Sequence, residues 1–434
     1  MGRPHRVDAP GLHRFDRLLS GRLWLLIATA IATATSLFGA FPTYDNLPRY
    51  DRDWAAVQHN ADHPFDQKGL ISTDRAFNFT FRVTVPLLGG LLGLSRNGYL
   101  VVQGLFGVAL LAATAHLVDR LTGSRRLGAL TAITVGLMWA GSCAFVELRA
   151  NFDAVAISLL VLAMASRRWP VVLLCTFLAT WTDERALPAA AFVLLFHHVV
   201  ESRDLNPVRA LKDPRCLAVG GAVVLRVVTR YAASAAFDIV QPSDFNLHHA
   251  ADQLGILPVG SWTALEGLWF FVAIGAVALV KARQRLVALA YLGTIAAVLI
   301  ANITVVDVTR SMAYLLPAGL AGMAVVVRTA IRRWCAPPSM WLSWSPSPGQ
   351  CTTSEEQPAC TGFTPCRSSS SATWPASAAA SADCHRSVVA ADVIASRLGI
   401  VSSGQTGSAE TYSWPPATTG GHPGMADVRV SRSR

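Results

Sequence analysis

The sequence predicts an all-α fold, a polytopic transmembrane helical bundle of about ten spans, and three observations lead to it. The chain is rich in apolar residues, poor in charged ones, and carries its basic residues in short clusters between apolar runs. Of its 434 residues, 52% are hydrophobic and 15% are charged, and the mean hydropathy is +0.39. Because about 25% of the residues of soluble domains are charged, a soluble fold does not fit this composition.

Ten apolar stretches approach the length needed to cross a membrane, which is about 20 residues with a lower end near 17. The three stretches within 151–200 are the shortest, and polar residues at 167–168 and 182–185 separate them. These short pieces could instead include re-entrant or interfacial segments. The other seven predicted spans cover residues 23–41, 98–118, 127–146, 217–240, 263–280, 286–306 and 311–330.

The positions of lysine and arginine set the predicted orientation, because cytoplasmic loops collect positive charge. With the basic segment 1–22 inside, every inside loop is basic, and the outside segments hold most of the acidic residues. This alternation requires that residues 81–94, which contain Pro86, lie on the outer interface without crossing. The prediction is therefore a multi-pass protein of the plasma membrane with a cytoplasmic N-terminus and membrane lipid as its partner. The net charge of +10 then reflects topology, and no nucleic-acid partner is expected.

The chain divides into a basic N-terminus (1–22), a transmembrane domain (23–334) whose first outer loop is 42–80, and a tail (335–434) of biased composition. In the tail, Ser, Pro, Ala, Thr and Gly dominate, lysine disappears, and Leu342 and Leu398 are the only leucines. Such a segment cannot build an apolar core. It is either a disordered cytoplasmic tail or a stretch translated out of frame.

The first outer loop contains an acidic pair, Asp51 and Asp53, shortly after the first predicted span. Two neighbouring carboxylates can hold a divalent cation or act as a general base. The alternative is that both side chains are solvated surface groups. The pair is the candidate catalytic site, a divalent cation is the one cofactor it suggests, and no dedicated metal site is predicted.

This layout resembles the GT-C class of membrane glycosyltransferases, which also have a cytoplasmic N-terminus, a long first outer loop and an early acidic pair. The resemblance covers the general layout of residues 1–334 and the one motif at Asp51 and Asp53. It implies a lipid-phosphate-linked sugar as donor, of the polyprenyl-phosphate type, and an acidic residue of the first outer loop as base. The sequence departs from many members in having no soluble extracytoplasmic domain after the last predicted span.

Three further polar clusters fall on the predicted outer face, each at a short link between apolar helices. They are either turn residues paired locally or the parts of a shared polar cavity that binds substrate, since ionisable groups held at membrane depth tend to be functional. Their members are Glu147, Arg149 and Asp153; Asp183, Glu184 and Arg185; and Asp307 and Arg310.

Arg226 and Arg230 lie four residues apart within the apolar run 217–240 and therefore on one helical face. Buried arginines need an anion. That anion is either a carboxylate of a neighbouring helix or a phosphate of a substrate. His197 and His198 are neighbours on another predicted helix and so point in different directions, which disfavours a shared metal ion. Their position at the inner end of that helix favours snorkelling or contact with lipid headgroups.

The leading hypothesis is a glycosyltransferase in which Asp51 or Asp53 takes the acceptor proton. Arg226 and Arg230, with Arg185 or Arg310, would neutralise the departing phosphate. The rival is a transporter or lipid flippase whose buried arginines line the substrate path, and a third reading is a structural role. Broken helices paired in two halves of the chain would favour transport, whereas a closed donor pocket opening sideways into lipid would favour transfer.

Overall fold

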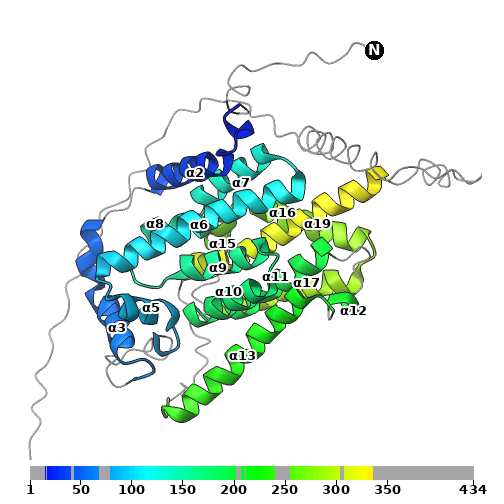
Figure 1. Ribbon diagram of the computed structural model, residues 1–434. Coiled ribbons are helices and arrows are strands. Elements are labelled where there is room, and N and C mark those ends of the chain that lie inside the picture. Colours follow the sequence, from blue (N-terminus) through cyan, green and yellow to red (C-terminus); the bar gives the residue numbers. More distant parts are fainter. Residues whose placement is uncertain are drawn as a thin grey trace, which may run out of the picture. The chain divides into compact units, whose positions relative to one another are not determined.

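The computed structural model describes residues 15, 17–40, 44–67, 79–201, 207–210, 212–239, 255–303 and 307–335 (Figure 1). Every regular element in these ranges is a helix, so the predicted all-α class is confirmed for them. All the described residues belong to one compact unit of the chain. The predicted tail from residue 336 onward, most of the N-terminus and positions 68–78 of the first outer loop lie outside the described residues.

Most predicted apolar stretches correspond to single helices. The first is α2 (Trp24–Ala40), and the second lies within α6 (Arg96–Thr122). Local chemistry limits α6: the Ser95 hydroxyl caps its start by accepting from the amide of Gly98, and Gly123, at φ 70°, ends it in the left-handed region. The other matching helices are α9 (Asp153–Ala165), α10 (Trp169–Thr182), α11 (Ala186–Glu201), α13 (Pro214–Ala236) and α17 (Arg285–Ile303).

Two predicted spans consist of two helices at an angle instead of one helix, which corrects the prediction. Residues 127–146 form α7 (Arg125–Leu137) and α8 (Trp139–Val146), bent by 60°. Gly141 permits this bend, because a Cβ there would overlap the carbonyl oxygen of Val135. The other bent pair is α15 (Leu257–Leu265) with α16 (Leu268–Lys281), bent by 91°. The last predicted span is one continuous helical run, in which α18 (Val308–Met312), η2 (Ala313–Leu315) and α19 (Leu316–Cys335) follow directly on one another.

The first outer loop is partly helical, with η1 (Tyr44–Tyr50) followed by α3 (Asp51–Asp62). The segment predicted not to cross contains α5 (Thr84–Leu92). At 1.5 Å per residue its nine residues reach about 14 Å, well short of a hydrocarbon core of about 30 Å. A short helix, α12 (Pro207–Ala210), precedes α13.

Length and composition qualify three helical segments of the described chain as membrane spans, or five if each bent pair counts as one. This is fewer than the ten predicted. Five further apolar helices of the described chain qualify over 10–17 residues, at or below the lower end of the length for a full crossing. The three long segments are Arg96–Thr122, Pro214–Ala236 and Val308–Thr329.

Helix α9 forms the centre of the packing, since α6, α10 and α11 all contact it (Figure 1). Nearly all of its side chains are buried, and its first residue is Asp153. Burying α9 on all sides therefore carries the carboxylate of Asp153 into the interior.

Elsewhere, α16 and α19 approach closely because Gly275 faces Gly322, where a Cβ would leave too little room.

Candidate functional site

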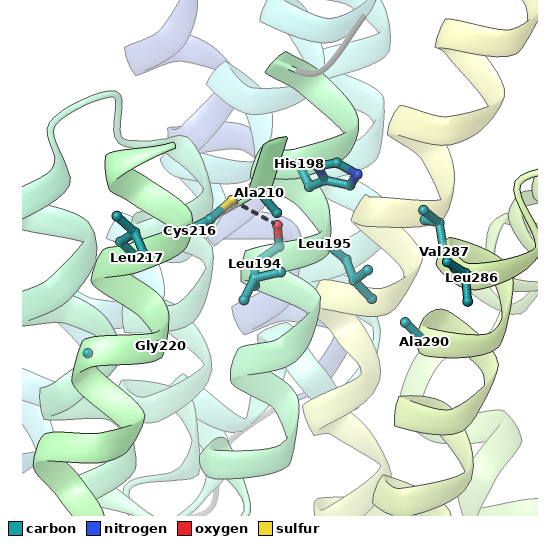
Figure 2. Close-up of a pocket in the computed structure, with 11 residues that line it drawn as sticks. Leu194, Leu195, His198, Ala210, Cys216, Leu217, Gly220, Leu286, Val287 and Ala290 are labelled. Atoms are coloured by element: carbon teal, nitrogen blue, oxygen red, sulfur yellow. Dashed lines mark hydrogen bonds between the residues drawn. The ribbon is translucent and has the colours of Figure 1, made fainter. Parts of the chain in front are cut away.

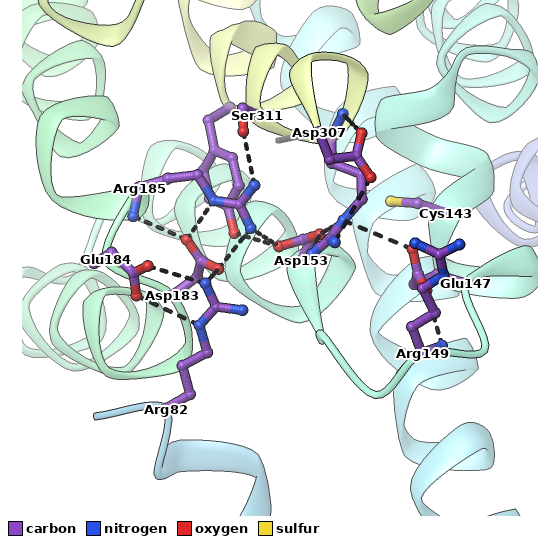
Figure 3. A network of polar contacts seen from close by, with 12 residues as sticks. Arg82, Cys143, Glu147, Arg149, Asp153, Asp183, Glu184, Arg185, Asp307 and Ser311 are labelled. Carbon is purple, nitrogen blue, oxygen red and sulfur yellow. Dashed lines mark hydrogen bonds and ion pairs between the residues drawn. The ribbon is translucent and has the colours of Figure 1, made fainter. Parts of the chain in front are cut away.

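The three polar clusters predicted from sequence meet in one network of ion pairs (Figure 3). The link between α8 and α9 supplies Glu147 and Asp153, the link between α10 and α11 supplies Asp183 and Arg185, and the start of α18 supplies Arg310. Because α9 packs against α10 and α11, the ends of these helices bring the clusters together.

Asp153 is the centre of the network and is 1% exposed. Its Oδ1 accepts from Arg185 Nη2 at 2.6 Å and from the Tyr314 hydroxyl at 3.2 Å. Its Oδ2 accepts from Arg310 Nε at 2.6 Å. With both oxygens bound to guanidinium groups, this carboxylate is a structural anchor that joins two arginines.

Asp183 is held in the same way. Its Oδ1 accepts from Arg185 Nε at 2.8 Å, and Oδ2 lies 3.0 Å from Arg82 Nη2. Burial by itself would raise the pKa of this carboxyl, but Arg185 and Arg82 outweigh it and hold the pKa well below its usual range. Arg185 also donates to the Ser311 hydroxyl at 2.9 Å.

Sequence reasoning missed Arg82, which joins the network from the segment before α5. It contacts both Asp183 and Glu184, the latter at 2.9 Å. Burial opposes its charge, but the two carboxylates prevail and raise its pKa. The available signal was a single arginine between Phe81 and Val83 at the edge of an apolar segment.

Glu147 differs from the other buried carboxylates. Its Oε1 accepts from the amide of Arg149 at 2.8 Å, and Oε2 lies 3.7 Å from Arg310 Nε. Burial raises its pKa, Arg310 counteracts this, and the charge of Asp153 raises it further. A carboxylate with a raised pKa exchanges protons closer to neutral pH, as a general base requires.

Arg226 is 3% exposed and lies apart from this network. Its Nε donates to the carbonyl oxygen of Thr180 at 3.0 Å, and its guanidinium lies 4.0 Å from the centre of a Trp181 ring. Within the described ranges it forms no ion pair, and its Nη1 has no hydrogen-bond partner. A carboxylate of a neighbouring helix, one of the two predicted anions, therefore forms no ion pair with Arg226 in the described ranges, and aromatic rings lie against the guanidinium instead.

Comparison with known proteins adds nothing to these residues. No family model, curated protein or solved structure matches this chain. The resemblance to GT-C enzymes therefore stays a prediction, and function has to be argued from the geometry.

Arg230 lies next to Arg226 in space, as their four-residue spacing predicts. Its guanidinium is 4.3 Å from the centre of the Phe81 ring, and that of Arg226 is 5.7 Å from the same ring. The Trp181 indole Nε1 is also buried without a hydrogen-bond partner in the described part of the chain. Two arginines and an indole N–H thus form a donor-rich group beside the link that carries Asp183 and Glu184.

Asp51 and Asp53 lie in the first turn of α3 and outside the ion-pair network. Asp51 is exposed and pairs with Arg96 Nη1 at 2.8 Å. Acidic residues are favourable at a helix start, so their position has a structural explanation too. Their helix nevertheless contacts the network, because Trp54 Nε1 donates to the carbonyl oxygen of Leu148 at 3.0 Å.

A second contact joins the first outer loop to the network: Arg149 lies over the ring of Tyr50, 5.2 Å from its centre. The remaining predicted residue, Asp307, caps α18 and lies 3.7 Å from Arg310. Across the described ranges, no three His, Cys, Asp or Glu side chains are grouped so that they could hold a metal ion. The geometry thus offers anion-binding donors and carboxylates.

Proposed function

We propose that this chain is a multi-pass membrane glycosyltransferase of GT-C-like layout. It transfers a sugar from a lipid-phosphate donor to an acceptor on the extracytoplasmic face of the plasma membrane. The ten-span topology with a cytoplasmic N-terminus belongs to this proposal. Its support is that the three long helices, two bent pairs and five shorter apolar helices add up to ten segments, between which basic loops alternate.

The observation that carries the proposal is the buried guanidinium of Arg226 with an unused donor, Nη1. Burying an arginine without a carboxylate is costly, so the site favours an anionic ligand. A phosphate oxygen can accept from Nη1, and a second one from the Trp181 Nε1. Arg230, on the same helical face, adds a second positive charge for the leaving phosphate.

In the proposed reaction, the oxygen of an acceptor hydroxyl forms a bond to the anomeric carbon of the sugar. The bond from that carbon to the phosphate oxygen breaks, and its electron pair leaves on the phosphate. Asp51 or Asp53 takes the hydroxyl proton. Glu147 is the competing base, because its buried position raises its pKa.

A transporter or lipid flippase is the second candidate, and the two bent helix pairs favour it. Broken helices often form the substrate site of transporters. Here α8 and α15, one half of each pair, contact each other, and both contact α18 of the network. The same arginines would then lie on a path for an anionic substrate.

The deciding experiment uses the full chain reconstituted in vesicles with a polyprenyl-phosphate sugar labelled in the sugar. Release of polyprenyl phosphate together with a labelled product supports transfer. Movement of intact donor between leaflets, without bond cleavage, supports transport and rejects the proposed chemistry.

A further inference from the structure

A second candidate site is an apolar pocket of about 400 Å³ between α11, α13 and α17 (Figure 2). Its walls include Leu194, His198, Cys216, Gly220, Val287 and Ala290. A volume of this size falls within the range of small-molecule sites, which is about 300–1,000 Å³. The pocket is not closed: Leu217 and Leu286, which also line it, are 54% and 66% exposed on the side of the bundle.

His198 is the polar side chain that gives this pocket specificity. It is 4% exposed, and within the described residues its Nε2 has no hydrogen-bond partner. Its neighbour His197, on a different face of α11, is satisfied by the carbonyl oxygen of Ala163 at 3.0 Å. A buried imidazole nitrogen without a partner, at the wall of an apolar pocket, indicates a ligand with one polar group and an apolar body.

The pocket lies at the far end of α11 from the ion-pair network. Arg185 directly precedes α11, and His198 follows it by thirteen residues, which is about 20 Å along a helix. Basic residues also gather at this end. Lys212 lies just before α13 and Arg285 begins α17, and both are exposed. The pocket is therefore at the other end of α11 from the ion-pair network, and Arg226 follows Gly220 by six residues, about 9 Å along α13.

We propose that this pocket binds one hydrocarbon chain of an anionic membrane phospholipid. The apolar walls take the chain, which enters from the side of the bundle between α13 and α17. His198 Nε2 hydrogen-bonds to an ester oxygen near the headgroup. Lys212 and Arg285 attract the anionic phosphate, a complementarity of charge that a neutral lipid or a second copy of this chain does not offer.

The test fills the pocket without disturbing the helix. A Cβ at Gly220 meets nothing within 4 Å, so Gly220→Leu places its side chain in open space. Leucine is also the better helix former. Gly293→Leu is the matched control, because Gly293 lies on α17 in equally open space and outside the pocket lining. Ala290→Leu fills the pocket from the opposite wall and serves as the second variant.

The measurement is binding of palmitoyl-oleoyl-phosphatidylglycerol to the purified full chain in detergent, followed by native mass spectrometry. We expect Gly220→Leu and Ala290→Leu each to weaken binding about tenfold or more, since several methylene groups lose their burial. Gly293→Leu should bind like the wild type. His198→Leu should also weaken binding, because the ester oxygen loses its donor.

Charge is tested separately. The double variant Lys212→Gln, Arg285→Gln should reduce the preference for phosphatidylglycerol over phosphatidylcholine, and Arg167→Gln, in another basic loop, should not. Equal binding of the two lipids by the wild type would overturn the anionic assignment. Unchanged binding by both filled variants would overturn the site, and so would a change of oligomeric state in Gly220→Leu, which would make a second copy the occupant.

Discussion

The guanidinium of Arg226 lies over the indole of Trp181, 4.0 Å from a ring centre, although the two residues are on different helices. Cation–π contacts of this kind stabilise a desolvated arginine by about 2 kcal/mol. They do not satisfy its N–H donors, and Nη1 stays unused within the described residues. An arginine stabilised by rings is therefore held in place and still able to bind an anion.

This relationship predicts how Arg226 variants separate folding from binding. Arg226→Leu leaves no carboxylate unpaired among the described residues, so the variant should fold with an unchanged or higher Tm. Donor binding should fall about tenfold or more in Arg226→Lys, because a point charge replaces the guanidinium fork. Thermal unfolding and binding of the labelled donor by the purified chain are the measurements. Loss of folded protein in Arg226→Leu would reveal a buried acid partner and contradict the phosphate role.

Arg185→Leu is expected to behave in the opposite way. It leaves Asp153 and Asp183 without their shared arginine in a buried site, where removing one partner costs about 3–5 kcal/mol. The expected result is a large fall in Tm or in the yield of folded protein. If Arg185→Leu and Arg226→Leu were equally stable, the distinction between a structural network and a binding group would be lost.

The double variant Asp51→Asn, Asp53→Asn tests the acidic pair. It keeps the shape of both side chains and removes the two carboxylates that could accept the proton. If one of them is the base, the transfer rate should fall by roughly 100-fold or more. Stability should change by less than about 1 kcal/mol, because the ion pair of Asp51 with Arg96 is exposed. A double variant with full transfer activity would remove the proposed base, and a parallel loss in Glu147→Gln would assign the role to Glu147.

Glu147 and Asp183 should respond to pH with opposite signs. The folded-state pKa of Glu147 is raised, so its contribution to stability falls as pH rises above its unfolded pKa of about 4.3. Glu147→Gln should then raise Tm at neutral pH, and the gain should vanish near pH 4. The folded-state pKa of Asp183 is depressed, so its contribution is present above about pH 3.9 and is lost in acid.

Asp183→Asn is the matched comparison for that experiment. It should lower Tm at neutral pH, by an amount that shrinks as the pH falls below about 4. The measurement is Tm as a function of pH for the wild type, Glu147→Gln and Asp183→Asn. Two variants that shift Tm with the same sign at neutral pH would contradict the opposed environments of these carboxylates.

The proposed topology predicts which positions face outward. Single cysteines at Gln58, an exposed position of α3, and at Gln253 of an otherwise Cys-free chain should react with an impermeant thiol reagent in intact cells. Cysteines at Ser124 and Gln284 should react only after the cells are opened. Ser124 caps α7 and lies in the short link between α6 and α7. Labelling at Ser124 in intact cells would overturn the ten-span arrangement.

The sequence by itself determined the helical class, the apolar segments and the sites of their polar links. These depend on local composition and on runs of apolar residues, and the boundaries of α2, α9, α10 and α11 follow from them closely. It also identified most members of the ion-pair network, because charged residues beside apolar helices are rare enough to notice.

Only the tertiary structure decided how these parts meet. The bends at α7–α8 and α15–α16 depend on close approaches, such as that of Gly141 to Val135, which composition does not reveal. The partners of Arg226 come from α10 and from the segment before α5, and those of Asp153 from the link between α10 and α11, from α18 and from η2. An ion pair is a distance between side chains, and for residues far apart in the chain only the packing of helices such as α9 against α10 and α11 sets that distance.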